Sequence, residues 1–323
     1  MKQSVCIGID MGGTNTAFGF VTKDGNVVAE GNISTTGHHN IDEYIKRLTL
    51  AIKEQWGSIN QEYQITAIGV GAPSGNYRTR SIEESANLPW QGVIPFCDIL
   101  EEIFGIPTFI TNDANAATLG EQIYGGAKGM QDFVMVTLGT GLGSGYVANG
   151  RLIYGHNGLA GELGHTTAIK DGRECGCGKK GCLETYCSAT GVKRTAIELM
   201  ATTNTKSELR DIPYNKLTSK DVAIAANNGD KLAQQVFQIT GEILGEALAN
   251  TVAITGPEAI FLMGGLTKAG DLLFNPLRKS FNKSVMFLFK DCVNILPSAI
   301  DGNVAILGAA ALAWSEIKES NNG

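Results

Sequence analysis

The chain has 323 residues, which is long enough for two compact domains of ordinary size. Its 26 basic and 32 acidic side chains give a net charge of −6, unlike the basic surfaces with which proteins bind nucleic acids or anionic membranes. The first apolar run, residues 5–9, ends at Asp10 and is neither a signal-peptide core nor a membrane-spanning helix. These observations favour a cytoplasmic protein that binds a small molecule and has no nucleic-acid or membrane partner.

The chain contains seven cysteines, and three of them lie between residues 175 and 182. An odd number with such local crowding favours a metal site in a reducing compartment over a disulfide framework. The other four stand in apolar or helical contexts, where a small buried hydrophobic residue is the usual explanation. No role is assigned to Cys6, Cys97, Cys187 and Cys292.

The N-terminal part of the chain alternates short apolar runs with glycine-rich and asparagine-rich turns, which is typical of strands. Apolar residues at helical spacing follow further along. In chain order we predict strands at 4–10, 16–22 and 27–33, a helix at 41–56, strands at 65–70 and 107–111, and a helix at 114–124. The first three strands are expected to form an antiparallel meander.

The same order of elements recurs from residue 133. Strands predicted at 133–138, 144–148 and 151–154 form a second meander, and helices and strands follow to the end of the chain. A duplicated unit of this kind is typical of actin-type and hexokinase-type ATPases, which have a ribonuclease H-like α/β fold. We therefore expect an α/β protein with two lobes, each built on a mixed sheet, and a nucleotide cleft between them.

Two polar stretches, residues 74–85 and 168–182, are too poor in apolar side chains to form core elements. Long loops of this kind usually carry function. A third irregular stretch, residues 209–218, is expected to cross the surface without a chemical role.

The first candidate phosphate site is the turn that follows the first strand. Gly12 and Gly13 let backbone N–H groups approach phosphate oxygens, and the hydroxyl of Thr14 adds a donor. Asp10 supplies a carboxylate for Mg²⁺, which prefers hard oxygen ligands and keeps much of its hydration. An ordinary hairpin turn is the alternative reading.

A second turn of the same chemistry stands at the corresponding place of the repeat, and we expect the two turns to face each other across the cleft. Its candidate nucleotide contacts are Thr137, Gly139, Thr140 and Gly141. A third glycine pair, Gly264 and Gly265, follows an apolar strand and is a candidate contact for the base or ribose.

Residues 143–148 formally match the dinucleotide-binding fingerprint, and Glu162 follows at roughly the spacing of its ribose-binding acid. The fingerprint requires a helix to begin there, whereas residues 146–150 predict a strand and a turn. A Walker A motif is absent too, because no Gly-Lys-Ser/Thr follows the required gap. We therefore expect neither a dinucleotide site nor a P-loop.

A histidine and three cysteines at short spacing form the most specific local pattern: His165, Cys175, Cys177 and Cys182. One imidazole and three thiolates complete a tetrahedral zinc site, and the glycines between them permit the necessary turns. Four protein ligands leave no open position, so the zinc is expected to be structural. An iron–sulfur cluster and a redox pair are the alternatives, although the former generally uses four cysteines and the latter a two-residue spacing.

His165 can serve a second purpose. With one ring nitrogen on zinc, the other carries a proton and becomes a fixed donor toward a substrate hydroxyl. Glu162 and Glu184 flank the same block. Two carboxylates and one N–H donor suit a polyol, although the ordinary reading of each glutamate is a solvated surface charge.

The predicted strand 107–111 ends in Asn112 and Asp113, which run into a helix. Asp113 fits a helix cap. It also fits a general base that accepts the proton of an attacking hydroxyl, while Asn112 binds a neighbouring hydroxyl. The two roles are compatible, and both stay open at this point.

Together these motifs closely resemble the ROK family of bacterial sugar kinases and repressors, above all its glucokinases. The resemblance runs from residue 5 to the final helix, and its most specific part is the histidine and cysteine block. It implies that Asp113 is the base that deprotonates the 6-hydroxyl of a sugar. The residues implied to hold the sugar are Asn112, Glu162, His165 and Glu184, with Gly75 and Asn87 as further contacts.

The resemblance also implies a small lobe formed by residues 1–111 and about 303–323, and a large lobe of residues 112–302 that carries the zinc loop. A homodimer is the usual assembly, with a tetramer as the alternative. The family's repressors carry a DNA-binding domain before the kinase-like part, and the few residues before the first glycine turn leave no room for one.

The implied reaction is ATP-dependent phosphorylation of a hexose at its 6-hydroxyl, with Mg²⁺ bound to the nucleotide. Glucose is favoured because residues 158–162 resemble the glucokinase version of this loop. Mannose, allose, fructose, N-acetylglucosamine and N-acetylmannosamine remain alternatives, as do ADP or polyphosphate as donors. A non-catalytic sugar sensor is a further alternative, which the presence of both Asp10 and Asp113 argues against.

Overall fold

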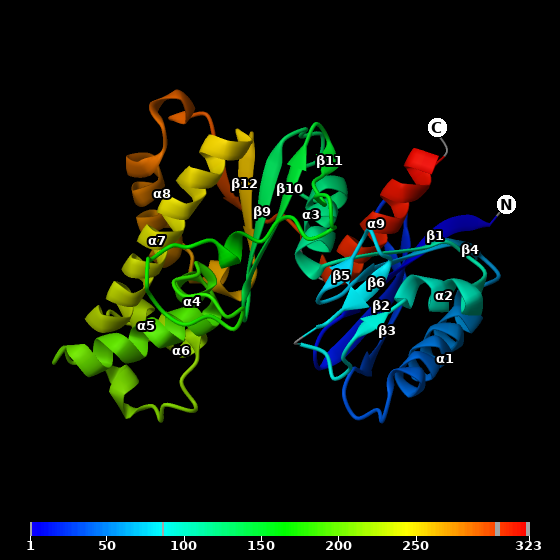
Figure 1. Ribbon diagram of the computed structural model, residues 1–323, viewed down its shortest axis with the longest axis horizontal. Coiled ribbons are helices and arrows are strands. Elements are labelled where there is room, and N and C mark those ends of the chain that lie inside the picture. The colour runs from blue at the N-terminus through cyan, green and yellow to red at the C-terminus, as the bar shows by residue number, and fades with distance from the viewer. Residues whose placement is uncertain (1, 86, 301–303, 321–323) are drawn as a thin grey trace. The chain divides into compact units, whose positions relative to one another are not determined.

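The computed structural model describes residues 2–85, 87–300 and 304–320 (Figure 1). The chain divides into two compact units. The first comprises Met1–Met130, Leu152–Ala160 and Ala299–Gly323, and the second comprises Gln131–Arg151 and Gly161–Ser298. Of the segment 303–323 that we predicted to join the small lobe, residue 303 and residues 321–323 lie outside the described residues.

The first unit is built on a five-stranded mixed sheet in the order β3-β2-β1-β4-β8. The predicted meander is confirmed, because β1, β2 and β3 pair antiparallel, while β4 pairs parallel with β1 and with β8. The strands are β1 (Gln3–Met11), β2 (Asn15–Thr22), β3 (Val27–Ser34), β4 (Tyr63–Gly71) and β8 (Thr108–Thr111).

Side-chain alternation along β1 decides which helices cover this sheet. Ile7 and Ile9 join a core with Leu48 of α1, whereas Gly8 between them points to the opposite face. A Cβ at Gly8 would overlap the carbonyl oxygen of Ile306 in α9, so the missing side chain allows the helix to pack closely. The helices of this unit are α1 (Ile41–Ile59), α2 (Phe96–Phe104), α3 (Asp113–Tyr124) and α9 (Val304–Ser320).

The second unit repeats the plan with a five-stranded sheet in the order β11-β10-β9-β12-β13. Its first three strands again pair in sequence, and β12 lies parallel to both β9 and β13. The strands are β9 (Phe133–Leu138), β10 (Leu142–Ala148), β11 (Arg151–Leu152), β12 (Ala259–Met263) and β13 (Asn294–Pro297). The equivalent strand order in both units confirms the predicted duplication and the α/β class.

The helices of the second unit bury a large apolar core. Leu244 and Leu248 of α7 and Phe274 of α8 pack with β9 and β12, and Figure 1 shows α7 and α8 side by side. The helical segments are α4 (Glu184–Cys187), α5 (Ala189–Thr202), α6 (Ser219–Asn227), α7 (Lys231–Thr255), α8 (Asp271–Ser284) and the short 3₁₀ turns η1 (Leu163–His165), η2 (Glu208–Asp211), η3 (Gly265–Ala269) and η4 (Phe287–Phe289).

The stretch 74–85, predicted to be a loop, instead contributes to a small three-stranded sheet. Its strands are β5 (Gly75–Asn76), β6 (Ser81–Glu83) and β7 (Val93–Ile94). Strands of two or three residues are too short to show an alternating pattern, which is why the sequence reading missed them. Ser74, Arg80 and Glu84 all have positive φ, so the chain bends sharply around these strands.

Within the residues that the structure covers, no helix combines the length and apolar character needed to cross a bilayer.

Candidate functional site

The first glycine turn joins β1 to β2. The Gly12 N–H donates to the Asn15 carbonyl at 2.9 Å, and the Thr35 N–H donates to the Thr14 carbonyl at 2.8 Å. A Cβ on Gly13 would stand 2.5 Å from the carbonyl oxygen of Asn87. The structure therefore brings Asn87, a predicted sugar contact, directly against the predicted phosphate turn, and explains why Gly13 carries no side chain.

A row of buried hydroxyl groups, which no sequence motif predicts, supports this turn. Thr16 Oγ1 lies 2.8 Å from Thr35 Oγ1 and 2.7 Å from the Tyr44 hydroxyl, and all three residues are fully buried. Since the Thr35 backbone also bonds to Thr14, these hydroxyl groups connect the turn to Tyr44 in α1. Each partner is far away in sequence, so no local pattern marks it.

Asp10 lies near the C-terminal end of β1, and two effects raise the pKa of its carboxyl group. Burial, reinforced by the negative charge of Asp113, raises the pKa of Asp10 to about 6. Burial also raises the pKa of Asp113, although solvent reaches this residue, because protein atoms crowd around its carboxylate. The charge of Asp113 therefore acts on Asp10, which places the two carboxylates in one electrostatic environment.

The raised pKa of Asp10 predicts a specific dependence of stability on pH. Between about pH 4 and 6 the folded chain keeps a proton on Asp10 that the unfolded chain has lost, so ionisation of Asp10 destabilises the fold at pH 7. We expect Asp10→Asn to raise the melting temperature at pH 7.5 by about 2 °C or more.

This gain is expected to shrink as the pH falls through 6, and scanning fluorimetry at pH 7.5, 6.5 and 5.0 measures it. Glu246→Gln, on an exposed part of α7, is the control and should show no such trend. An equal gain from Asp10→Asn at pH 5.0 and 7.5 would contradict the assignment.

Asn112 and Asp113 divide the roles that the sequence left open. Asn112 is the cap of α3, because its Oδ1 accepts the N–H of Asn115 at 2.7 Å. Asp113 is the first helical residue, and its Oδ1 accepts the neighbouring Ala114 N–H at 2.9 Å. Asp113 is therefore not needed as the cap.

The second glycine turn, between β9 and β10, is held by the beginning of α5. The Gly139 carbonyl accepts the Ala189 N–H at 2.9 Å, and the Thr140 carbonyl accepts the Thr190 hydroxyl at 3.0 Å. Gly264 has a φ of 109°, and a Cβ there would overlap the Leu138 carbonyl. The third glycine pair thus packs against the second turn, beside predicted nucleotide contact Thr137 at the end of β9.

The dinucleotide fingerprint of residues 143–148 is excluded by the structure, because this segment lies inside strand β10. Gly143, Ser144 and Gly145 pair with β9, so no helix begins there.

The histidine and cysteine cluster has the geometry of a zinc site. One ligand atom from each of the four residues lies within 4.8 Å of the others. Two sulfurs on a tetrahedral zinc are about 3.8 Å apart; the Sγ atoms of Cys177 and Cys182 are 3.6 Å apart, and Cys175 Sγ lies 3.6 Å from His165 Nδ1. The donor set therefore fits zinc.

The two glutamates predicted to bind a polyol both lie beside this cluster. With Nδ1 turned to the sulfurs, His165 Nε2 lies 3.8 Å from Glu162 Oε2. Glu184 Oε2 accepts the Leu142 N–H at 2.9 Å, and Glu184 Oε1 lies 3.9 Å from Cys175 Sγ. Glu184 thus links the second glycine turn to the cysteine loop, a contact that sequence spacing does not reveal.

The structure assigns the predicted site residues to two groups. The first unit holds Asp10, Gly12, Gly13, Thr14, Gly75, Asn87, Asn112 and Asp113, and the second holds Thr137, Gly139, Thr140, Gly141, Glu162, His165, Glu184, Gly264, Gly265 and the three cysteine ligands.

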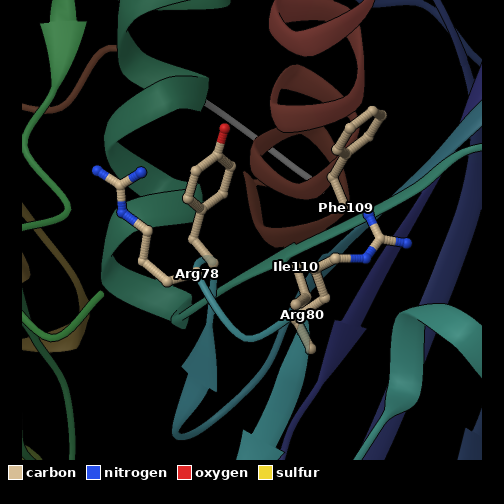
Figure 2. Close-up of a pocket in the computed structure, with 5 residues that line it drawn as sticks. Arg78, Arg80, Phe109 and Ile110 are labelled. Atoms are coloured by element: carbon tan, nitrogen blue, oxygen red, sulfur yellow. The ribbon is translucent and has the colours of Figure 1, made fainter. Parts of the chain in front are cut away.

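A cavity of about 210 Å³ lies apart from these residues, within the first unit (Figure 2). Its lining consists of Tyr77, Arg78, Arg80, Phe109 and Ile110. Arg80 is already paired with Glu101 at 2.7 Å and with Asp98 at 3.5 Å. None of the predicted site residues is among those that line this cavity.

Comparison with known proteins agrees with these features. The sequence model of the ROK family matches residues 6–316. A glucokinase of Halalkalibacterium halodurans is 35% identical over 329 residues, spanning 100% of this chain and 99% of that protein. The crystal structure of a ROK family glucokinase from Streptomyces griseus, in complex with glucose and AMPPNP, has 31% identity and a TM-score of 0.77, and the match covers 96% of this chain and 99% of that one.

A regulator also resembles part of the chain. The DNA-binding transcriptional dual regulator NagC of Escherichia coli is 30% identical over 215 residues, which is 67% of this chain and 52% of the regulator.

Proposed function

Because the chain belongs to the ROK family and is a sugar kinase, we propose that it transfers the γ-phosphoryl group of ATP to the 6-hydroxyl of glucose. The observation that carries this proposal is the pair of carboxylates in the first unit, Asp10 and Asp113. Burial raises the pKa of both, so a bound cation or proton would stabilise these groups. Full-length similarity to glucokinases supports glucose as the acceptor.

We assign the proton transfer to Asp113. Its raised pKa makes the carboxylate a better base than an aspartate of ordinary pKa, and it accepts the proton of the 6-hydroxyl as the phosphoryl group arrives. Asn112 uses its Oδ1 to accept the Asn115 N–H, so its amide N–H groups are proposed to donate to a sugar hydroxyl. We further propose that the sugar is positioned by Glu162, His165 and Glu184, with Gly75 and Asn87 as additional contacts.

The nucleotide is assigned to the two glycine turns. Backbone N–H groups of Gly13 and Gly141, with the hydroxyls of Thr14, Thr137 and Thr140, are the proposed phosphate donors. Gly12 and Gly139, whose own N–H groups bond to the Asn15 and Gly141 carbonyls, are proposed to let the backbone approach the nucleotide, and Gly264 and Gly265 to contact the base or ribose. Mg²⁺ bound with ATP would be held by Asp10 and would neutralise phosphate charge. Zinc on His165 and the three cysteines would fix the loop that carries the sugar contacts.

A hexose panel tests the substrate. We expect the purified chain with Mg-ATP to release ADP fastest with glucose, with kcat/KM at least about tenfold above mannose, allose, fructose, N-acetylglucosamine and N-acetylmannosamine, because each differs at a hydroxyl held by a fixed polar group. Replacing ATP with ADP or polyphosphate, and following glucose 6-phosphate directly, tests the donor. A panel in which no sugar is phosphorylated by any donor would favour a sugar-sensing regulator.

A further inference from the structure

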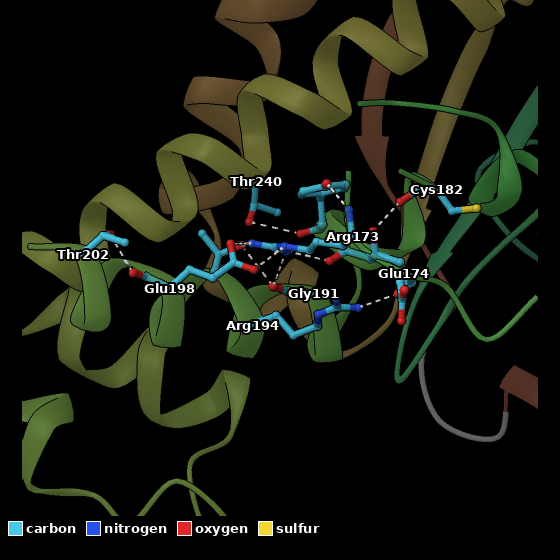
Figure 3. Close-up of polar contacts among 11 residues, drawn as sticks. Arg173, Glu174, Cys182, Gly191, Arg194, Glu198, Thr202 and Thr240 are labelled. Carbon is cyan, nitrogen blue, oxygen red and sulfur yellow. Dashed lines mark hydrogen bonds and ion pairs between the residues drawn. The ribbon is translucent and has the colours of Figure 1, made fainter. Parts of the chain in front are cut away.

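Arg173 lies in the cysteine loop, two residues before Cys175, and every N–H of its guanidinium has a partner (Figure 3). Its Nε and Nη2 donate to the two carboxylate oxygens of Glu198, at 2.8 and 2.5 Å. Nη1 donates to the Thr185 carbonyl at 2.6 Å and to the Gly191 carbonyl at 3.2 Å. Nη2 also donates to Thr195 Oγ1 at 2.9 Å, so all five donors are used.

The backbone of Arg173 is held as firmly as its side chain. Its N–H donates to the Tyr186 hydroxyl at 2.9 Å, and its carbonyl accepts the Gly181 N–H at 2.8 Å. The guanidinium carbon lies 4.3 Å from the centre of the Tyr186 ring. Gly181 directly precedes the ligand Cys182, so Arg173 fixes both arms of the loop that carries the three cysteines.

The partners of Arg173 belong to two helices, α4 and α5. Thr185 and Tyr186 lie in α4, which begins with Glu184, and Gly191, Thr195 and Glu198 lie in α5. Figure 3 shows the guanidinium reaching from the loop onto α5 beside the Arg194 side chain. One side chain therefore connects the cysteine loop to the helix that presents a proposed sugar contact.

Apolar packing cannot hold this loop in place. Residues 168–182 are mostly exposed, and Ile169, the loop's large apolar side chain, is 39% exposed. The Arg173 side chain, by contrast, is only 8% exposed. Burying a guanidinium costs free energy unless all its N–H groups are hydrogen-bonded. We therefore interpret the buried Arg173 as a residue that fixes the conformation of the loop more than it adds to the stability of the fold.

We propose that Arg173 is a positioning residue that sets the cysteine loop before zinc binds and, through α4, sets Glu184 toward the sugar. A preformed set of ligands binds its metal more tightly, because less ordering is required on binding. This inference rests on the proposed zinc site and on the proposed sugar contacts.

The test is the rate at which zinc leaves the full-length protein to a chromogenic chelator, without sugar or ATP. We expect Arg173→Met to release zinc about 10 to 100 times faster than the parent chain. Arg173→Lys should fall between the two, because an ammonium keeps the charge but cannot reproduce five donors in a planar fork. Glu198→Gln, at a carboxylate with a 54% exposed side chain, should also accelerate release and covers the case in which Arg173→Met fails to fold.

Arg194→Met is the matched control. Arg194 also comes from α5 and reaches the same loop, but through a single bond of 2.9 Å to the Glu174 carbonyl. It should release zinc within about twofold of the parent rate. In kinase assays, Arg173→Lys should raise the KM for the hexose and leave the KM for ATP unchanged, a split that general destabilisation would not produce.

Equal zinc release from the parent, Arg173→Met and Glu198→Gln would overturn the proposal, as would equal acceleration by Arg194→Met. A parent chain that binds no zinc would overturn it too. A chain that shows the expected zinc kinetics but phosphorylates no sugar would support the role of Arg173 and contradict the proposed function, so the two failures are distinguishable.

Discussion

Asp113→Asn is expected to lower kcat by about 10²- to 10⁴-fold while the affinity for the hexose stays within a few-fold of the parent. Asparagine has the same shape, and its Oδ1 can still accept the Ala114 N–H that Asp113 accepts at 2.9 Å, so the start of α3 is retained. What it cannot do is take up a proton. The measurements are ADP release at saturating substrates and calorimetric titration with glucose.

Asp211→Asn provides the control, since Asp211 is exposed in η2 and lies far from the site in sequence. It should keep the parent rate. If Asp113→Asn retained more than about a tenth of the parental kcat, general-base catalysis by this residue would be the wrong assignment.

Cys177→Ala is expected to abolish zinc binding and with it the ordered sugar contacts. Freshly purified, reduced parent protein should contain close to one zinc per chain, and the variant less than about a tenth, because a structural zinc needs all four of its ligands. The KM for the hexose should rise at least about tenfold, since His165 loses the metal that fixes its ring.

Mass spectrometry of the metal content and steady-state kinetics make these measurements. Cys292→Ala is the matched control, because Cys292 is also an exposed cysteine but lies outside the cluster. It should retain zinc and activity. A Cys177→Ala protein with a full complement of zinc would show that the cluster is not the metal site.

The sequence was most informative where structure depends on neighbours along the chain. The meanders were predicted because tight turns separate short apolar runs, and β9 matches its predicted range of 133–138. Helix α1 begins at Ile41 as predicted but continues through Gly57 to Ile59, whose side chain packs against the core of the first unit.

Contacts between distant residues could not be read in this way. The bond from Leu142 to Glu184 and the five bonds of Arg173 join residues from separate elements, and each depends on how those elements pack. Similarly, a lone asparagine and aspartate give no means of telling which one caps a helix. The structure assigns that role to Asn112 through a single hydrogen bond to Asn115.

The packing of α9 against β1 has a consequence for biosynthesis. Gly8, and Gly69 in β4, are covered by Ile306 and Ala309 of α9, so this face of the sheet cannot be completed until α9 has been synthesised. Residues 161–298 are synthesised before α9, so the second unit can complete its core while the first unit still lacks this helix. We therefore expect the second unit to mature before the first, the reverse of the usual order from the N-terminal domain onward.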